Sequence, residues 1–369
     1  MKVAIAQADL ARGIQLVQRA VSHRPSTPGS GGVLLEAADG RLWFKATDYE
    51  LAITCSCQAA VDRAGSIVLP VRYLADVIRK LPSGEVSIDV LAERPVAEFA
   101  WQRSRFSLHG STAEQFPQLP ACRSEAAFHL SQDELKDLIR GVAFAVSDNE
   151  DRAVLTGALL AIDGKTVEMV GTDGARLAYA SCQAQRAAEG KTQAVIPGRA
   201  FLELTRALNY EGEATVRVVL EANQVFFQVA DLSFMSRLIE GEFPRFRSVI
   251  PTDFPSVLTV DGGALLAACE RAAVVAAEKA SAVQLNADQG LLTIHTEAAD
   301  VGKVREELSC EFAGEPITAA FNVRFLIEGL RTLGQGPVTL EFGGQLKPCR
   351  ITRLGDSSAY YIVLPMRVQ

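Results

Sequence analysis

The sequence predicts an α+β fold made of three homologous domains in tandem, each a pair of βαβββ units. The first observation is a repeat: Asp39-Gly40 recurs as Asp163-Gly164 and, more loosely, as Asp288-Gln289-Gly290, at a step of about 125 residues. The second is that short β-branched runs outnumber helical segments in each repeat, which indicates antiparallel sheets with helices against one face. A chain of 369 residues has room for three such domains.

Each repeat opens with an apolar-periodic segment that predicts a helix, and these segments occupy 10–22, 135–147 and 265–277. Alternating or β-branched runs such as "ELAITCSCQ" follow and are typical of strands. A strand, a second helix and another strand come next, within 67–90, 195–220 and 320–342. Prolines around 120–124 and 251–255 mark the joints, so we expect domains at 1–122, 123–252 and 253–369.

The last predicted strand lies in "YYIVLPMRVQ", where Tyr360 to Met366 form a nearly continuous apolar run. A run without alternation predicts a strand that is covered on both faces and is not an edge facing water. Pro365 has no backbone N–H to donate, so regular pairing should end there. We expect the strand to dock in the third domain and to leave Met366 and Arg367 beside a cleft.

The second helix of each repeat carries two arginines seven residues apart, which places both side chains on one helix face. Apolar residues between them, among them Leu74, Leu202 and Leu330, predict a buried opposite face. A single pair is most simply a solvated helix face. Three parallel pairs suggest a surface that meets phosphate groups, formed by Arg72 and Arg79, Arg199 and Arg206, and Arg324 and Arg331.

Composition narrows the classes of function. No apolar run approaches the ~18 residues of a membrane span, and the N-terminus lacks a secretory pattern, so we expect a soluble, cytoplasmic protein. The net charge of −7 excludes a chain that is basic throughout, but it allows a local basic surface. The seven cysteines and four histidines form no metal or redox motif, so we expect no metal site and no cofactor.

Several stretches resemble one family, the bacterial sliding clamps that form the β subunit of DNA polymerase III, and the resemblance spans the whole chain. The most specific stretches are "GTDGARLA" at 171–178, "IEGEFPRFRSVIP" at 239–251 and "YYIVLPMRV" at 360–368, supported by "RPSTP" at 24–28 and "RFSL" at 105–108. The resemblance implies a head-to-tail homodimer that closes a ring, with helices lining the hole and antiparallel sheets outside.

The resemblance also implies a function and its partners. The ring would encircle double-stranded DNA without reading its sequence and would act as a non-catalytic processivity factor. It would tether the catalytic subunit of DNA polymerase III, the clamp loader and other proteins that carry clamp-binding peptides. By the same resemblance, the residues that approach the DNA backbone are Arg24, Arg72, Arg152 and Arg199.

Two further sites follow from the resemblance alone. The dimer interface would set Phe106 and Leu108 against Val274 and Val275. A partner-peptide pocket between the second and third domains would be formed by Leu155, Thr172, Gly174, Arg176, Leu177, Pro244, Val249, Ile362, Val363, Leu364, Pro365, Met366 and Arg367. The chain departs from the family pattern at Ala153, Val154, Ala175, Ser248 and the turn at 29–32.

Other functions stay open at this point. One alternative is a specialised second clamp copy, or a three-repeat scaffold that binds proteins but never encircles DNA. Another is a nucleotidyltransferase in its own right. The enzyme is the least supported, because Asp48, Asp163 and Asp173, which a two-metal site would need, fall at turn positions that the repeat already explains.

Overall fold

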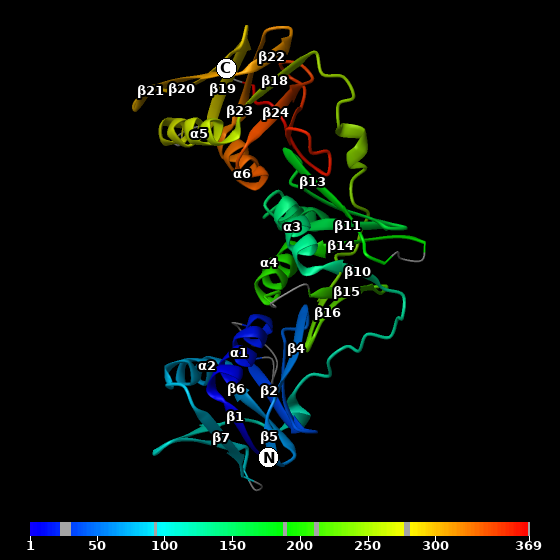
Figure 1. The fold of residues 1–369 in the computed structure, drawn as a ribbon, viewed down its shortest axis with the longest axis vertical. Coiled ribbons are helices and arrows are strands. Elements are labelled where there is room, and N and C mark those ends of the chain that lie inside the picture. Colours follow the sequence, from blue (N-terminus) through cyan, green and yellow to red (C-terminus); the bar gives the residue numbers. More distant parts are fainter. Residues whose placement is uncertain (23–30, 92–93, 187–189, 210–213, 277–280, 368–369) are drawn as a thin grey trace. The chain divides into compact units, whose positions relative to one another are not determined.

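The computed structural model describes residues 1–22, 31–91, 94–186, 190–209, 214–276 and 281–367 (Figure 1). Its internal contacts divide the chain into two compact units. Unit 1 comprises Met1–Gln132 and Leu202–Leu238, and unit 2 comprises Asp133–Phe201 and Ile239–Gln369. The central repeat is therefore shared between the two units, and helix α4 (Gly198–Ala207) crosses from one to the other.

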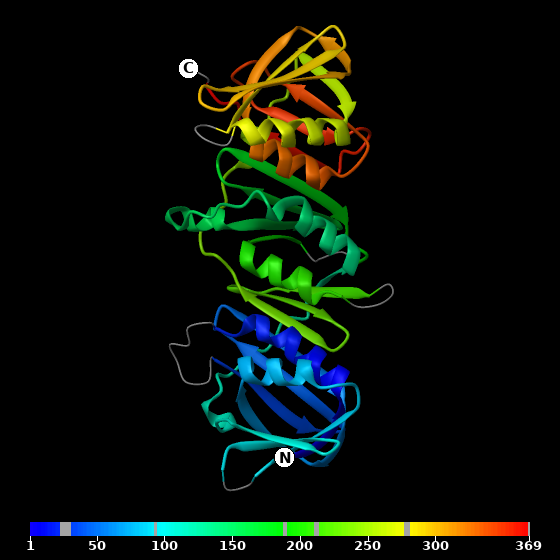
Figure 2. The same cartoon turned by 90° about the vertical axis from the view of Figure 1, so that its left-hand side faces the viewer.

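Unit 1 contains two antiparallel sheets, one of five strands and one of eight. The strand order is β5-β1-β7-β8-β9 in the first and β10-β15-β16-β17-β4-β3-β2-β6 in the second. Figure 2 shows helices α1 and α2 lying side by side across the strands. The elements are β1 (Lys2–Ala6), α1 (Gln7–Val17), η1 (Gln18–Ala20), β2 (Gly32–Ala38), β3 (Arg41–Thr47), β4 (Leu51–Gln58), β5 (Ala60–Arg63), β6 (Gly65–Pro70), α2 (Val71–Lys80), β7 (Glu85–Val90), β8 (Val96–Trp101), β9 (Ser104–His109), η2 (Ala113–Gln115), β10 (Phe128–Ser131), β15 (Thr215–Leu220), β16 (Gln224–Val229) and β17 (Leu232–Arg237).

Unit 2 contains a nine-stranded and a four-stranded antiparallel sheet. Their orders are β14-β11-β12-β13-β26-β25-β24-β18-β22 and β21-β20-β19-β23. The elements are α3 (Gln132–Ala143), η3 (Glu150–Thr156), β11 (Gly157–Asp163), β12 (Thr166–Thr172), β13 (Arg176–Gln183), β14 (Lys191–Pro197), η4 (Phe246–Val249), β18 (Ser256–Asp261), α5 (Gly262–Ala276), β19 (Ala282–Asp288), β20 (Leu291–Ala298), β21 (Gly302–Ser309), β22 (Glu311–Gly314), β23 (Ile317–Asn322), α6 (Val323–Leu333), β24 (Pro337–Phe342), β25 (Cys349–Arg353) and β26 (Ala359–Val363).

The element order confirms the α+β prediction and its pairs of βαβββ units. Strand β1, helix α1 and strands β2 to β4 form the first unit, and the same order recurs around the other five α-helices of the described residues, with β5 and β22 as additional short strands. The helices predicted at 10–22 and 135–147 begin three residues earlier, at Gln7 and Gln132. Helix α1 follows Ala6, whose side chain cannot cap the helix, so the sequence carries no start signal there.

Helices press closely on the sheets at two glycines. A Cβ atom added to Gly13 of α1 would lie 2.5 Å from the ring of Phe44, and one added to Gly329 of α6 would lie 2.4 Å from the ring of Tyr361. Both distances are shorter than any van der Waals contact, so only glycine permits these approaches. Phe44 and Tyr361 are in turn almost fully buried. These contacts fix the helix layer against the strands.

The apolar C-terminal run forms β26, which is an interior strand of the nine-stranded sheet. It pairs with β25 on one side and with β13 on the other, where Leu177 is opposite Ile362. This confirms that the run is covered from Tyr361 to Val363, whereas Leu364 is 41% exposed. The strand was predicted to dock in the third domain, and it does so through β25. It also pairs with the central repeat, because β13 belongs to that repeat. Pairing ends at Val363, two residues before Pro365, and the N–H of Met366 then donates to the carbonyl of Ala320 at 2.7 Å.

No helix in the described ranges is long and apolar enough to cross a membrane.

Candidate functional site

A mainly apolar cavity of about 300 Å³ opens in unit 2 beside the end of β26. Its described walls come from η3, the β12–β13 turn, the segment around η4 and the C-terminal strand. The residues that line it are Arg152, Leu155, Thr172, Gly174, Ala175, Arg176, Leu177, Pro244, Arg245, Phe246, Val249, Ile362 and Leu364.

Most residues of the predicted partner-peptide pocket meet in this cavity. They are Leu155, Thr172, Gly174, Arg176, Leu177, Pro244, Val249, Ile362 and Leu364. Val363, Pro365, Met366 and Arg367 are not part of its lining. Val363 is fully buried, and Met366 is held at the backbone of Ala320. The cleft expected beside Met366 and Arg367 therefore lies a few residues earlier in the chain, at Ile362 and Leu364.

The β12–β13 turn shapes one wall through its own side chains. The hydroxyl of Thr172 donates to the carbonyl of Arg176 at 2.6 Å and accepts from the N–H of Gly174 at 3.1 Å. Gly174 has a φ of 94°, a backbone angle that residues with a Cβ atom rarely adopt. The N–H of Leu364 donates to the carbonyl of Ala175 at 3.0 Å, so the tail is tied to this turn. The turn and the tail consequently form one continuous wall.

Arg176 stabilises this wall through hydrogen bonds to three neighbouring groups. Its side chain is only 10% exposed and donates to Asp173 at 2.9 Å, to the carbonyl of Phe144 at 2.8 Å, and to Glu328 of α6. Burial alone would lower the pKa of Arg176, but the hydrogen bond to Glu328 and the neighbouring negative charges outweigh it, and the pKa is raised. The guanidinium, which also lies over the Phe325 ring, joins the central and third repeats within unit 2.

Three lining residues were missed as pocket residues by the sequence reasoning. Ala175 was noted only as a departure from the family pattern, and Arg245 and Phe246 stand in "FPRFR" directly after the predicted Pro244. Phe246 is nearly buried and anchors η4. A fourth residue, Arg152, was predicted to approach DNA, and the structure places it at this cavity. No local sequence pattern could have placed Arg152 at this cavity, because η3 and the β12–β13 turn are separated along the chain.

The paired arginines of the second helices all have exposed side chains, but the members of a pair differ. Arg79 donates to Asp76 at 3.0 Å, Arg206 to Glu203 at 3.1 Å and Arg331 to Glu270 at 2.7 Å. Arg72 and Arg324, within the described ranges, have no carboxylate partner. The later arginine of each pair is thus partly neutralised. Leu202 was predicted to belong to the buried stripe, and this was wrong: the side chain is 50% exposed.

Arg24 lies outside the described residues. The turn at 29–32 is described only from residue 31 on.

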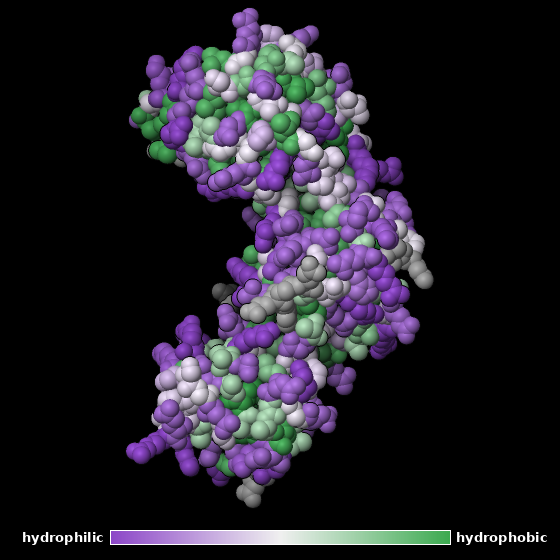
Figure 3. Space-filling view, in the orientation of Figure 1, coloured by the Kyte–Doolittle hydropathy of each residue, from purple (hydrophilic) through white to green (hydrophobic). Residues whose placement is uncertain are grey.

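The residues predicted for a dimer interface lie at two sheet edges. One pair lies on an edge strand, and the other lies on a helix that contacts an edge strand. Strand β9, with Phe106 and Leu108, is the edge of the five-stranded sheet of unit 1. Phe106 stacks on Phe99 with ring centroids 4.6 Å apart. Strand β21 is an edge of the four-stranded sheet of unit 2 and contacts α5, whose Val274 is 76% exposed. Figure 3 shows apolar side chains gathered at the end of unit 2 that carries β21 and α5.

The two edges also differ in charge. Arg105 of β9 and Arg103 directly before it are exposed, whereas β21 carries Lys303 and Arg305 together with Glu306 and Glu307. Glu306 accepts from Arg271 of α5 at 2.7 and 2.8 Å, and this hydrogen bond lowers the pKa of Glu306. Val275 lies next to Val274 on α5 and is partly buried. The edge of unit 1 is therefore basic at Arg103 and Arg105, whereas the charges along β21 balance, with Glu307 paired to Arg305 at 2.8 Å and Glu306 to Arg271.

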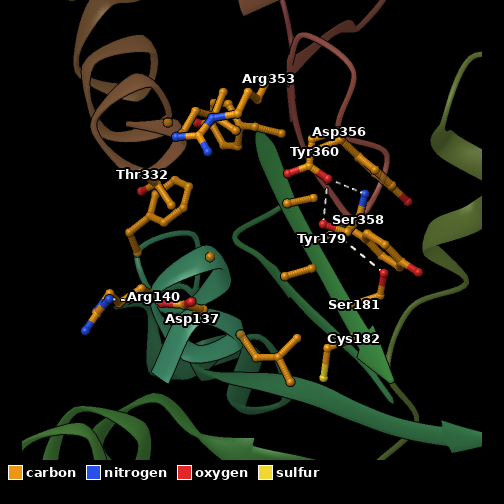
Figure 4. Close-up of a pocket in the computed structure, with 18 of the residues that line it drawn as sticks. Asp137, Arg140, Tyr179, Ser181, Cys182, Thr332, Arg353, Asp356, Ser358 and Tyr360 are labelled. Carbon is orange, nitrogen blue, oxygen red and sulfur yellow. Dashed lines mark hydrogen bonds and ion pairs between the residues drawn. The ribbon is translucent and has the colours of Figure 1, made fainter. Parts of the chain in front are cut away.

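A second cavity, of about 490 Å³, lies between α3, α6 and the strands β13 and β26 (Figure 4). It contains none of the predicted site residues. Two pairs of its polar groups bind each other: Arg140 pairs with Asp137 at 3.0 Å, and the hydroxyl of Ser358 donates to Asp356 at 2.6 Å. Within the described ranges, no group of three or more His, Cys, Asp or Glu residues could hold a metal ion.

Comparison with known proteins identifies one family along the whole chain. Family models of the DNA polymerase III β subunit match its N-terminal domain at residues 1–120, its central domain at 129–245 and its C-terminal domain at 247–367. The chain is 33% identical to a β sliding clamp of Synechococcus elongatus, with 100% of both chains covered. It is 30% identical to a β sliding clamp of Staphylococcus aureus over 95% of this chain and 94% of the relative.

Solved structures agree with the sequence comparisons. The fold matches a DNA polymerase sliding clamp from Bacillus subtilis with a TM-score of 0.96 at 28% identity, and all of both chains is covered. A DNA polymerase III β subunit from Pseudomonas aeruginosa matches with a TM-score of 0.94, also at 28% identity and full coverage.

Proposed function

The chain belongs to the family of the DNA polymerase III β subunit, the bacterial sliding clamps, and from this premise we propose that two copies close head to tail into a ring around duplex DNA in the cytoplasm. As a member of this family it is a DNA polymerase processivity factor and a non-catalytic subunit. A closed ring would keep the polymerase on DNA by topology, so it would need no tight or sequence-specific contact.

The observation that carries this proposal is the pair of open sheet edges. An edge strand exposes a row of unpaired N–H and C=O groups, which another chain can pair with. Strand β9 presents Arg105, and β21 presents the pair of Arg305 and Glu307. Two different open edges suit a heterologous contact, which closes a ring when the rotation between subunits permits it. Phe106 and Leu108 would then meet Val274 and Val275 at the centre of the contact.

The DNA would lie against the helices. Six exposed arginines on the second helices, at 72, 79, 199, 206, 324 and 331, suit phosphate contacts that depend on salt and carry no sequence information. An acidic chain with one basic lining would hold DNA there and repel it elsewhere. We keep Arg24 and Arg152 as further predicted DNA contacts.

The cavity at Leu155, Leu177 and Ile362 would take short peptides of partner proteins. Its volume and its apolar walls suit two or three apolar anchors, and apolar burial would supply most of the affinity. The polymerase catalytic subunit, the clamp loader and other partners would use it in turn. A specialised second clamp copy would share all of these features. Such a copy would differ from the main replicative clamp in the partners that it binds.

Neutralising the unpaired arginines should weaken DNA binding more than neutralising the paired ones. We expect R72Q with R324Q to lower the slope of log affinity against log salt concentration by roughly one unit for each phosphate that an arginine no longer neutralises. The matched variant R79Q with R331Q should change it less, because Asp76 and Glu270 already offset those charges. Binding of linear duplex DNA, measured by fluorescence anisotropy at several salt concentrations, checks this. Equal slopes in both variants and the parent would show that these helices do not contact DNA.

A further inference from the structure

The second cavity of unit 2, between α3, α6 and the strands β13 and β26, is used by none of the contacts proposed for DNA, for the dimer or for partner peptides (Figure 4). Its volume of about 490 Å³ lies in the range typical of sites for small organic molecules. It lies at the N-terminal end of β26, whereas the partner-peptide cavity lies beside the C-terminal end of that strand. The two cavities are therefore separate sites.

Small residues create this space. A Cβ atom added to Gly141 of α3 would lie 3.0 Å from the Cβ of Ala180 on β13, and Gly329 lets α6 approach Tyr361 of β26 in the same way. Each helix therefore lies close on its own part of the sheet. Ala180 pairs with Ala359 across the strands, and Ala359 shares a sheet face with Tyr361 because the two are two residues apart. The floor between the helices is thus a flat surface of methyl groups, on which a planar ring can lie.

Two aromatic rings belong to the lining and are held in place. The rings of Phe144 and Tyr361 have centroids 5.4 Å apart and planes tilted by 48°. Tyr361 is almost fully buried, and the carbonyl of Phe144 accepts from Arg176 at 2.8 Å. Leu138 and Leu333 add aliphatic side chains to the walls. Tilted rings in fixed positions offer edge-to-face contacts to an aromatic guest.

Two of the three carboxylates in the lining are engaged. Asp137 is paired with Arg140 at 3.0 Å. Asp356 accepts from the N–H of Ser358 at 2.8 Å and from its hydroxyl at 2.6 Å. A ligand would meet these groups as hydrogen-bonded pairs and not as free charges.

The two remaining charged groups, Glu134 and Arg353, lie at different helices. Glu134 of α3 is close to the thiol of Cys182, because burial and then the negative charge of Glu134 raise the pKa of that thiol to about 12. The Nη2 atom of Arg353 lies 2.9 Å from the position that a Cβ on Gly334, directly after α6, would take. Arg353 is exposed, and within the described ranges its guanidinium has no carboxylate or hydrogen-bond partner. An unengaged cation therefore stands beside the apolar floor.

We propose that this cavity binds a small planar aromatic molecule that carries one carboxylate, with the ring on the floor of Ala180 and Ala359 and the carboxylate on Arg353. The flat floor and the rings of Phe144 and Tyr361 suit an aromatic body, whose burial would supply most of the affinity. A guanidinium holds a carboxylate through charge-assisted hydrogen bonds in a fixed geometry. A neutral ring of the same shape would lose these bonds and bind more weakly.

Naphthalene-2-carboxylate and 2-naphthamide are the matched probes, because they share one ring system and differ in charge. We expect the full-length protein to bind the carboxylate at roughly millimolar concentration, as a ligand of about a dozen non-hydrogen atoms does. The amide should bind about fivefold more weakly, since it cannot form the charge-assisted hydrogen bonds. The difference should shrink as salt rises, because Arg353 is exposed. NMR titration of each probe at two salt concentrations measures both effects.

Three variants then assign the binding to residues. R353Q should lower the affinity for the carboxylate about fivefold, to that of the amide, and leave the affinity for the amide unchanged. R140Q is the matched control, because Arg140 lines the same cavity but is paired with Asp137, and it should keep the preference. T332W should abolish binding of both probes, since the half-buried Thr332 lines the cavity from α6 and the indole would fill it. Circular dichroism and sedimentation of each variant show whether the fold is intact.

The outcomes do not depend on the proposed ring or on its partner peptides. Equal binding of the two probes by the parent, or an unchanged preference in R353Q, overturns the proposal. Parental binding of both probes by a folded T332W places them elsewhere on the molecule and overturns it as well. V249D with L364D, which charges the partner-peptide cavity, should bind both probes as the parent does. Loss of the probes in that variant would place them in the partner-peptide cavity and contradict the proposal.

Discussion

Replacing Val274 and Val275 together with aspartate is expected to turn the dimer into monomers. Val274 is 76% exposed in the isolated chain and Val275 is partly buried, so V274D alone, which leaves the subunit core untouched, should shift the equilibrium in the same direction. In the proposed ring the two carboxylates would be buried without partners, at a cost of several kcal/mol each. Because each 1.4 kcal/mol is a factor of about ten, the dimer dissociation constant should rise at least a thousandfold. Analytical ultracentrifugation at micromolar concentration measures this.

The matched control for the interface is L354D. Leu354 is 53% exposed in the same unit but lies directly after β25 and belongs to neither β21 nor α5. It should sediment as the parental dimer. A dimer of V274D/V275D with parental affinity would show that the interface assignment is wrong, and a monomeric L354D would show that the test reports loss of fold.

Charging the apolar cavity is expected to abolish peptide binding while the dimer stays intact. Val249 and Leu364 line the cavity and are 57% and 41% exposed, so V249D with L364D leaves the core untouched. A peptide anchor would then have to bury apolar surface against two carboxylates, and we expect the affinity to fall at least about a hundredfold. Fluorescence anisotropy with a labelled peptide that carries one glutamine and two leucine anchors measures the affinity, and stimulation of the polymerase measures its consequence.

L354D again serves as the control for exposure and charge, with one substitution of the same kind outside the cavity. Parental peptide affinity in V249D/L364D would place the binding site elsewhere on the molecule. Truncation after Pro365 would be a weaker test, because the N–H of Met366 donates to the carbonyl of Ala320 and Met366 does not line the cavity.

Local patterns predicted the architecture well. The recurrence of Asp39-Gly40 near residues 163 and 288 established the tandem repeats, and apolar periodicity located the six α-helices of the described ranges. These signals are local or self-similar, so they need no knowledge of which strands meet. The covered C-terminal strand was predictable for the same reason, since an apolar run without alternation leaves no face for water.

Long-range pairing could not be predicted in this way. Nothing in "YYIVLPMRVQ" indicates that Ile362 pairs with Leu177, or that the tail joins the central repeat to the third. The roles of single arginines depended on such contacts. Arg176 is a brace because Glu328 and Phe144 converge on it, and Arg152 reaches the cavity because η3 lies beside the β12–β13 turn. The domain boundaries at 122 and 252 remain predictions, because the sheets run continuously across neighbouring repeats.

The most direct test of the ring is retention on DNA of different topology. Labelled protein is loaded by a clamp loader onto a nicked circular plasmid, separated from free protein by gel filtration, and filtered again after the plasmid is cut at one site. A ring that encircles DNA should elute with the circular plasmid in moderate salt and be lost from the linear one, because it slides off the ends. Equal retention on circular and linear plasmid would contradict encirclement and would favour a protein that binds DNA only through its surface charge.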